Sequence, residues 1–190
     1  MTIILTNDDG IDAPGIKALQ QAINGMGIIV APKNHQSGCG HQVTTHQPIE
    51  VQRRSHTEYA VDGTPADCTR IALTQFDRDR IKWVLSGINA GGNLGVDVYI
   101  SGTVAAVREA AIHGIPGIAI SHWIKRPLVI DWALAAKCST RVLQILFDRP
   151  LPDRCFWNVN LPHLTSDNPE PEIVFCEPSI DPLQVNYRIE

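Results

Sequence analysis

The first ten residues of the chain constrain its fold more than any other stretch. Residues 3–5 form a short, uninterrupted apolar run, which is typical of a strand buried on both faces of a parallel sheet. The run ends in the sequence Asn7-Asp8-Asp9-Gly10. Because adjacent side chains of a strand point to opposite faces, Asp8 and Asp9 can share one site only where the strand has ended. Gly10 permits the turn that this requires.

Two neighbouring carboxylates repel each other unless a cation or a proton lies between them. Ligands of α/β proteins bind at the carboxyl ends of the strands, where this pair is expected. A hard divalent cation such as Mg²⁺ or Mn²⁺ suits oxygen ligands of this kind. The alternative is that residues 7–10 form only a polar turn, since Asn, Asp and Gly are all common turn residues.

Apolar strand patterns and helical patterns alternate along the rest of the chain. The expected strands are residues 28–32, 49–52, 58–61, 83–86, 117–121, 156–162 and 172–176, and the expected helices are residues 16–23, a helix capped by Thr64, residues 104–114 and residues 129–147. This order predicts an α/β fold with a doubly wound, mostly parallel sheet, and the segment 49–61 adds a small β-hairpin. The 190 residues suffice for a single domain.

Composition excludes several classes of protein. The net charge of −4 argues against non-specific binding to nucleic acid or to an anionic membrane, which requires a basic surface. No apolar run approaches the length of a membrane span. The five cysteines include no C-x-x-C pair, so they indicate neither a zinc site nor a redox motif. Unpaired thiols and an N-terminus without a signal-peptide pattern predict a cytoplasmic protein.

Three polar segments each follow a predicted parallel strand, so they are expected to meet at one edge of the sheet. They are residues 7–10, 34–40 and 87–95. In the second segment, Ser37-Gly38 offers a hydroxyl and a backbone amide to a metal or an anion, although a simple turn explains it equally well. The third segment holds four glycines and two asparagines, and each asparagine offers an amide oxygen to a hard cation.

The sequence Ser101-Gly102-Thr103 directly precedes the expected helix at residues 104–114. A plain N-cap explains a Ser or Thr at this place. The same start also suits a phosphate, because it combines free amides, two hydroxyls, the positive end of the helix dipole and a glycine that allows close approach. This edge of the sheet would then hold both carboxylates that can bind a metal and a helix start that can bind a phosphate. Such an arrangement is typical of a metal-dependent phosphohydrolase.

Five motifs, in order from the N-terminus to about Leu161, resemble the SurE family (survival protein E). This family consists of metal-dependent nucleoside monophosphate phosphatases, also called 5′/3′-nucleotidases. The motifs occupy residues 6–15, 31–38, 61–68, 86–95 and 101–106. The resemblance implies a Rossmann-like sheet, a homodimer or homotetramer, and a nucleoside monophosphate rather than a nucleic-acid duplex as the substrate. It also implies that this chain lacks the family's C-terminal segment.

The resemblance assigns roles to individual residues. Asp8, Asp9, Ser37 and Asn89 correspond to the ligands of one divalent cation, Mg²⁺ or Mn²⁺. Our hypothesis for the mechanism makes the two aspartates catalytic as well, because Asp8 or Asp9 would orient the attacking water. The phosphate side of the site corresponds to Asn93, Ser101, Gly102 and Thr103.

Two other functions remain open at this point. A nucleotide-binding module with little turnover would use the same residues. A zinc deacetylase on a similar fold also uses adjacent aspartates together with histidines, but no His-Pro sequence precedes Asp8-Asp9 here.

Overall fold

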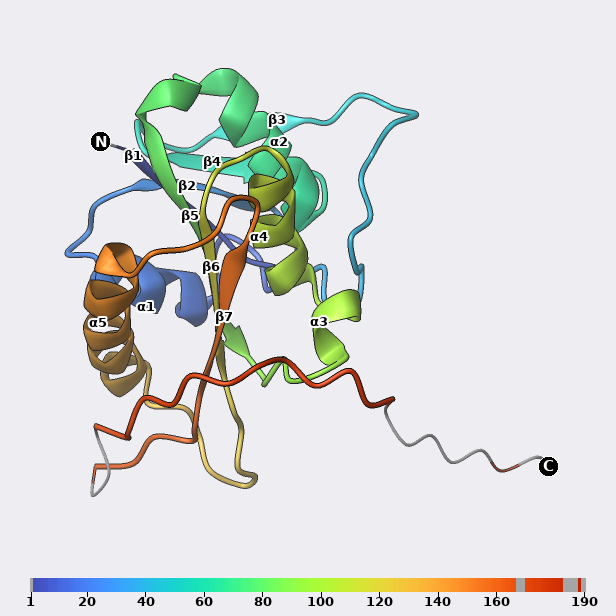
Figure 1. Cartoon of the computed structure of the whole chain (residues 1–190). Coiled ribbons are helices and arrows are strands. Elements are labelled where there is room, and N and C mark those ends of the chain that lie inside the picture. Colours follow the sequence, from blue (N-terminus) through green and yellow to red (C-terminus); the bar gives the residue numbers. More distant parts are fainter. Residues whose placement is uncertain (1, 167–169, 183–187, 189–190) are drawn as a thin grey trace.

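The computed structural model describes residues 2–166, 170–182 and 188 (Figure 1). In this part of the chain, a single seven-stranded sheet has the order β3-β4-β2-β1-β5-β6-β7. The strands are β1 (Thr2–Thr6), β2 (Ile28–Pro32), β3 (Val51–Arg53), β4 (Glu58–Val61), β5 (Ile81–Ala90), β6 (Gly117–His122) and β7 (Phe156–Leu161). All neighbouring strands are parallel except β3, which pairs antiparallel with β4 and forms the expected hairpin.

Helices cover both faces of the sheet (Figure 1). They are α1 (Pro14–Ala22), α2 (Pro65–Gln75), a 3₁₀ turn η1 (Arg78–Arg80), α3 (Asp97–Ile100), α4 (Gly102–Ile112) and α5 (Trp132–Asp148). Leu5 belongs to the core cluster under α1 and α5, whereas its neighbour Ile4 belongs to the cluster that packs against α2. Both side chains are fully buried, so β1 is covered on both faces as its apolar run predicts. The predicted α/β class and doubly wound sheet are confirmed.

The order of the strands reverses between β1 and β5. From β1 the chain proceeds through β2 to β4 on one side, and it then returns to β5 and continues through β6 to β7 on the other side. In open α/β sheets, the carboxyl ends of the two strands at such a reversal border the ligand-binding crevice. The turn at residues 7–10 therefore lies beside the end of β5.

Two predictions about strands are wrong. Residues 87–90 belong to β5 and not to a loop, because Gly87, Asn89 and Ala90 pair with β6 after a shift in register. Residues 172–176 form no strand in the described part of the chain. This segment contacts the domain through side chains instead: the Phe175 ring packs edge-on against Trp157, 5.7 Å between centroids.

Side-chain caps determine where three helices begin. Thr64 and Asp67 form a capping box at the start of α2, as the position of Thr64 predicts. The Asp131 carboxylate accepts a hydrogen bond from Leu134 N at 2.9 Å, so α5 begins at Trp132 and not at residue 129. The Ser101 hydroxyl accepts from Val104 N at 3.2 Å, and α4 therefore begins at Gly102. Among the helices in the described part of the chain, none combines the length and the apolar sequence that a membrane span requires.

Candidate functional site

Asp8 lies at the carboxyl end of β1 with its side chain against the first turn of α4. The residue is only 4% exposed. Its carboxylate Oδ1 accepts a hydrogen bond from the Thr103 hydroxyl. A Cβ added to Gly102 would lie 2.8 Å from Asp8 Cβ, so only glycine fits there without a shift of the chain. The structure thus brings Asp8, an expected metal ligand, into direct contact with the start of α4, the expected phosphate-binding site.

The environment of Asp8 disfavours its ionised form. Burial raises the pKa of the Asp8 carboxyl, and the negative charge of Asp9 raises it further, while the hydrogen bond from Thr103 acts in the opposite direction. A cation bound beside Asp8 would stabilise the ionised carboxylate. The electrostatics of the pair therefore fit a divalent cation.

Asp9 reaches from the end of β1 to the end of β5. Its Oδ2 accepts a hydrogen bond from Ala90 N at 3.3 Å, and its Oδ1 lies 3.5 Å from His35 Nδ1. Asn89, the residue before Ala90, donates from Nδ2 to the Gly91 carbonyl at 2.8 Å, which leaves its Oδ1 for another partner. Carboxylate and amide oxygens from two neighbouring strand ends form the hard ligand set that Mg²⁺ and Mn²⁺ prefer.

The loop after β2 runs beside Asp8. Gln36 N donates to the Asp8 carbonyl at 2.7 Å, which fixes the loop one residue before Ser37. Ser37 is exposed, and no hydrogen bond of its side chain is present among the described residues. Ser37 therefore follows directly after the residue that contacts Asp8, and its side chain is open to a ligand.

The start of α4 uses its two hydroxyls within the protein. Ser101 caps the helix and Thr103 donates to Asp8; the two residues are 7% and 0% exposed. Of the backbone amides in the first helical turn, that of Val104 donates to Ser101 Oγ, so those of Gly102 and Thr103 remain the groups best suited to an anion. Thr103 therefore contacts Asp8, an expected metal ligand, and it also lies at the start of α4, the expected phosphate site.

Asn93, the remaining residue expected to bind phosphate, is held by β6 and β7. Its Nδ2 donates to Ser121 Oγ at 2.8 Å, and its main chain bonds to the side chains of Asn158 and Asn160. The site residues expected from the sequence did not include Ser121, Asn158 or Asn160. The signal was the spacing Asn158-x-Asn160 within an expected strand, which places both amides on one face.

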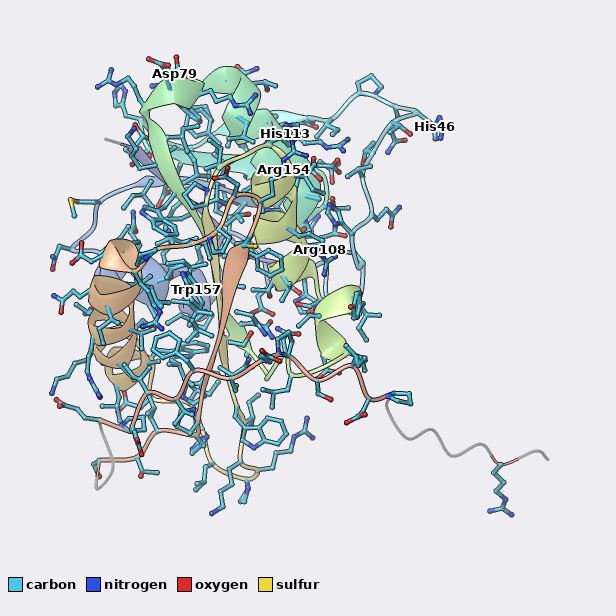
Figure 2. All side chains as sticks on the ribbon, in the orientation of Figure 1. His46, Asp79, Arg108, His113, Arg154 and Trp157 are labelled. Atoms are coloured by element: carbon cyan, nitrogen blue, oxygen red, sulfur yellow. The ribbon has the colours of Figure 1, made fainter. Side chains whose placement is uncertain are left out.

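A second cluster fixes the segment that carries Ser37. Glu109 on α4 is 2% exposed and accepts hydrogen bonds from His41 at 2.7 Å, Arg70 at 2.6 Å and His113 at 3.0 Å. Burial alone would raise the pKa of Glu109, but its hydrogen bonds to Arg70 and His41 hold the pKa below the usual value. Arg108 lies on α4, and His113 is the residue that caps its C-terminal end (Figure 2). The His41 contact ties the loop between β2 and β3 to α4.

Histidines and cysteines do not form a metal site in the described residues, where no group of three or more His, Cys, Asp or Glu side chains could hold an ion. A metal at Asp8 and Asp9 would therefore take Ser and Asn oxygens as its other protein ligands. This set differs from the histidine-rich set of a zinc enzyme.

Comparisons with known proteins agree with one another. The family model described as survival protein SurE matches residues 3–181. A relative from Nostoc sp. is 67% identical over 191 residues, which cover 100% of this chain and 84% of the relative. A protein of Geotalea uraniireducens named 5′-nucleotidase SurE is 41% identical, with 88% of this chain and 68% of that protein covered. The crystal structure of SurE from Aquifex aeolicus superposes with a TM-score of 0.80 at 37% identity, covering 88% of this chain and 68% of that one.

Proposed function

This chain belongs to the survival protein SurE family, and on that premise we propose that it removes phosphate from nucleoside 5′- and 3′-monophosphates with one divalent cation. The Geotalea uraniireducens relative named 5′-nucleotidase SurE supports the reaction class, which is hydrolysis of a phosphoric monoester. The acidic net charge of −4 fits a small phosphorylated substrate better than a nucleic-acid duplex.

The contact between Asp8 and the first turn of α4 carries this proposal. Thr103 donates to the Asp8 carboxylate, and Gly102 packs against its Cβ. A cation bound by Asp8 and a phosphate bound at the helix start would therefore be neighbours. This arrangement favours phosphoryl chemistry over binding of a neutral ligand.

The proposed cation site uses oxygens from three segments, namely those of Asp8, Asp9, Ser37 and Asn89. A cation bound there would neutralise phosphate charge and lower the pKa of a bound water. One of the two aspartates would also orient the attacking water, and Asp9 reaches from the end of β1 to the end of β5. The reaction would then be an in-line attack on phosphorus.

The proposed phosphate site is the start of α4 together with Asn93. The backbone amides of Gly102 and Thr103 would bind phosphate oxygens at the positive end of the helix and stabilise the charge that develops on the transferred group. Gly102 allows close approach because it has no Cβ. Ser101 would contribute by capping the helix, and Thr103 by holding Asp8.

Phosphate release tests this proposal. It is measured from a panel of nucleoside 5′- and 3′-monophosphates with Mn²⁺ or Mg²⁺, then with a chelator, and with the Asp8→Asn variant. Release that needs both the metal and Asp8 supports the proposal. Release that persists in chelator contradicts the metal requirement, and saturable nucleotide binding without release would favour a binding module instead.

We also infer that the protein acts in the cytoplasm as a homodimer or homotetramer. All five cysteines are free, and Cys155 and Cys176 are exposed, a state that a reducing compartment maintains. The oligomer is what the family resemblance implies. Light scattering on the purified protein measures its mass directly, and a monomer at micromolar concentration would contradict this inference.

A further inference from the structure

The main chain of Asn93 is held by two side-chain amides of β7. Asn160 Oδ1 accepts a hydrogen bond from Asn93 N at 2.8 Å, and Asn160 Nδ2 donates to the Asn93 carbonyl at 3.0 Å. Asn158 Nδ2 donates to the same carbonyl at 2.8 Å. The Asn160 amide thus makes both hydrogen bonds that the main chain of a neighbouring strand would make.

The side chain of Asn93 is held from β6. Its Nδ2 donates to Ser121 Oγ at 2.8 Å, and Ser121 is fully buried. Ser121 pairs with Asn160 in the register of β6 and β7, so these two side chains lie on the same face of the sheet. Both the main chain and the side chain of Asn93 are therefore fixed by adjacent strands.

The two residues before Asn93 also lie directly on the strand ends. Gly91 N donates to the His122 carbonyl at 3.0 Å. A Cβ on Gly92 would lie 2.8 Å from Trp123 Cε3 and 3.6 Å from Asn160 Oδ1, so a side chain at this position would have to displace the Trp123 ring. The chain that leaves Asn89 is consequently held in place through Asn93.

We propose that Asn160, with a smaller contribution from Asn158, is a positioning residue for phosphate hydrolysis that acts through Asn93. Its amide fixes the main chain of Asn93, and this sets where the Asn93 side chain meets the phosphate. The inference rests on the proposed function, because Asn93 is one of the proposed phosphate-binding residues. Catalysis is sensitive to such positioning, since a displacement of about 1 Å costs on the order of 100-fold in rate.

Alanine variants of the two β7 residues test the proposal. Asn160→Ala removes two of the three hydrogen bonds to the main chain of Asn93, and Asn158→Ala removes the third. We expect kcat for nucleoside monophosphate hydrolysis to fall by about 10- to 100-fold in the first variant and by a smaller factor in the second, with a smaller change in KM. Asn160→Asp keeps the acceptor but places a carboxylate beside the Asn93 carbonyl, so it should not rescue kcat.

A double-mutant cycle separates positioning from general damage to the fold. If Asn160 acts through the Asn93 side chain, Asn93→Ala and Asn93→Ala/Asn160→Ala have the same kcat, because the side chain that Asn160 positions is already absent. Independent effects would instead multiply, and that result overturns the proposal. Wild-type kcat in Asn160→Ala would overturn it as well.

Thr140→Val is the matched control for lost hydrogen bonds. Thr140 on α5 donates to the Ala22 and Ala136 carbonyls at 2.9 and 3.1 Å, and neither partner is among the residues that hold Asn93. This variant should lower Tm by an amount similar to Asn160→Ala while kcat stays at the wild-type value. A kcat loss in both variants would assign the effect to stability and not to positioning.

Measuring the binding of inorganic phosphate distinguishes a failure of this inference from a failure of the proposed function. It is measured by calorimetry in the presence of Mn²⁺ for the wild type, Asn93→Ala and Asn160→Ala. A wild type that releases no phosphate from any nucleotide would refute the proposed function alone. In that case an equal loss of phosphate affinity in both variants supports the positioning role, and unchanged affinity in Asn160→Ala refutes it.

Discussion

Thr103 donates its hydroxyl hydrogen to the carboxylate of Asp8, although the two residues are 95 positions apart in the chain. Both are almost completely buried, Thr103 at 0% and Asp8 at 4% exposure. This contact joins the end of β1 to the first turn of α4. The proposed metal side and the proposed phosphate side of the site are thereby held in one fixed arrangement.

Thr103→Val is expected to damage both stability and turnover. Valine has nearly the same shape as threonine, but it leaves the buried Asp8 carboxylate without its hydroxyl donor. A buried acceptor that loses its partner costs about 1–3 kcal/mol, which corresponds to a Tm lower by about 2–4 °C per kcal/mol. Thermal melts measure the first effect. Phosphate release should fall by about 10- to 100-fold, as for other residues that orient metal ligands.

Thr103→Ser is the control for this change. It keeps the hydroxyl and removes only a buried methyl group, which costs about 1 kcal/mol. Turnover within a few-fold of the wild type in the serine variant would assign the valine effect to the lost hydrogen bond. Equal turnover losses in both variants would show that packing and not the hydrogen bond is what matters.

Asp8→Asn should abolish metal-dependent phosphate release. Residues that merely orient a metal ligand already cost about 10- to 100-fold in affinity or activity, so loss of the charged ligand itself should cost at least about 100-fold. Asp12→Asn is a matched control, because Asp12 follows in the same turn but its side chain is 72% exposed and pairs with Arg54. Normal activity of Asp8→Asn under saturating Mn²⁺ would contradict the assigned role.

The same substitution should stabilise the metal-free protein as the pH rises. Burial raises the pKa of Asp8 in the folded state above the ordinary value of 3.8. At any pH between 3.8 and the raised pKa, the folded state therefore binds more protons than the unfolded state. Stability is therefore lost as the pH increases through that window, and asparagine avoids the loss. We expect the Tm of Asp8→Asn to exceed that of the wild type at about pH 7 in chelator, with a smaller difference near about pH 4. A difference independent of pH would refute this assignment.

Gly102→Ala should impair the site even though alanine favours helices. The new Cβ would lie 2.8 Å from Asp8 Cβ and 3.0 Å from Cys39 Sγ, so the helix start or Asp8 must move. A shift of about 1 Å would lower phosphate release by on the order of 100-fold. The measurement is kcat together with Mn²⁺ affinity. Unchanged values of both would mean that the contact between α4 and Asp8 is not required.

Much of the fold follows from the sequence because fully buried strands leave a strong signal. Ile4 and Leu5 are adjacent and pack into two different core clusters, which is why an uninterrupted apolar run predicts a strand covered on both faces. The polar turn after β1 then indicates the ligand-binding edge. Caps such as Thr64 were predictable for a similar reason, since the capping box is a local pattern.

The features that were missed depend on contacts distant in sequence. Gly87 and Asn89 are poor strand formers, so only their pairing with β6 reveals that β5 continues through them. The sequence suggests a helix cap or a phosphate ligand for the hydroxyl of Thr103, and only the fold shows that it donates to Asp8. The side chains of Asn158 and Asn160 resemble ordinary polar positions of an edge strand until the loop at Asn93 is placed on them.

Glu109→Gln should weaken the attachment of the loop that carries Ser37. Glu109 is 2% exposed and accepts from Arg70, His41 and His113, and these partners hold its pKa below the ordinary value of 4.5. A depressed pKa contributes stability that is present above the ordinary value and lost as the pH falls through the folded-state value.

A glutamine side chain is neutral, so it cannot offer the three partners the charged acceptor that the carboxylate provides. The free energy of unfolding should therefore fall by about 1–3 kcal/mol near neutral pH. Because glutamine does not titrate, the deficit relative to the wild type should shrink between about pH 5.5 and about pH 3.5. Urea unfolding at both pH values measures it. Glu58→Gln is the control, since the Glu58 carboxylate pairs with Lys17 at the surface, and exposed pairs contribute about 0–1 kcal/mol. An equal deficit at both pH values would show that the buried charge of Glu109 does not stabilise the fold.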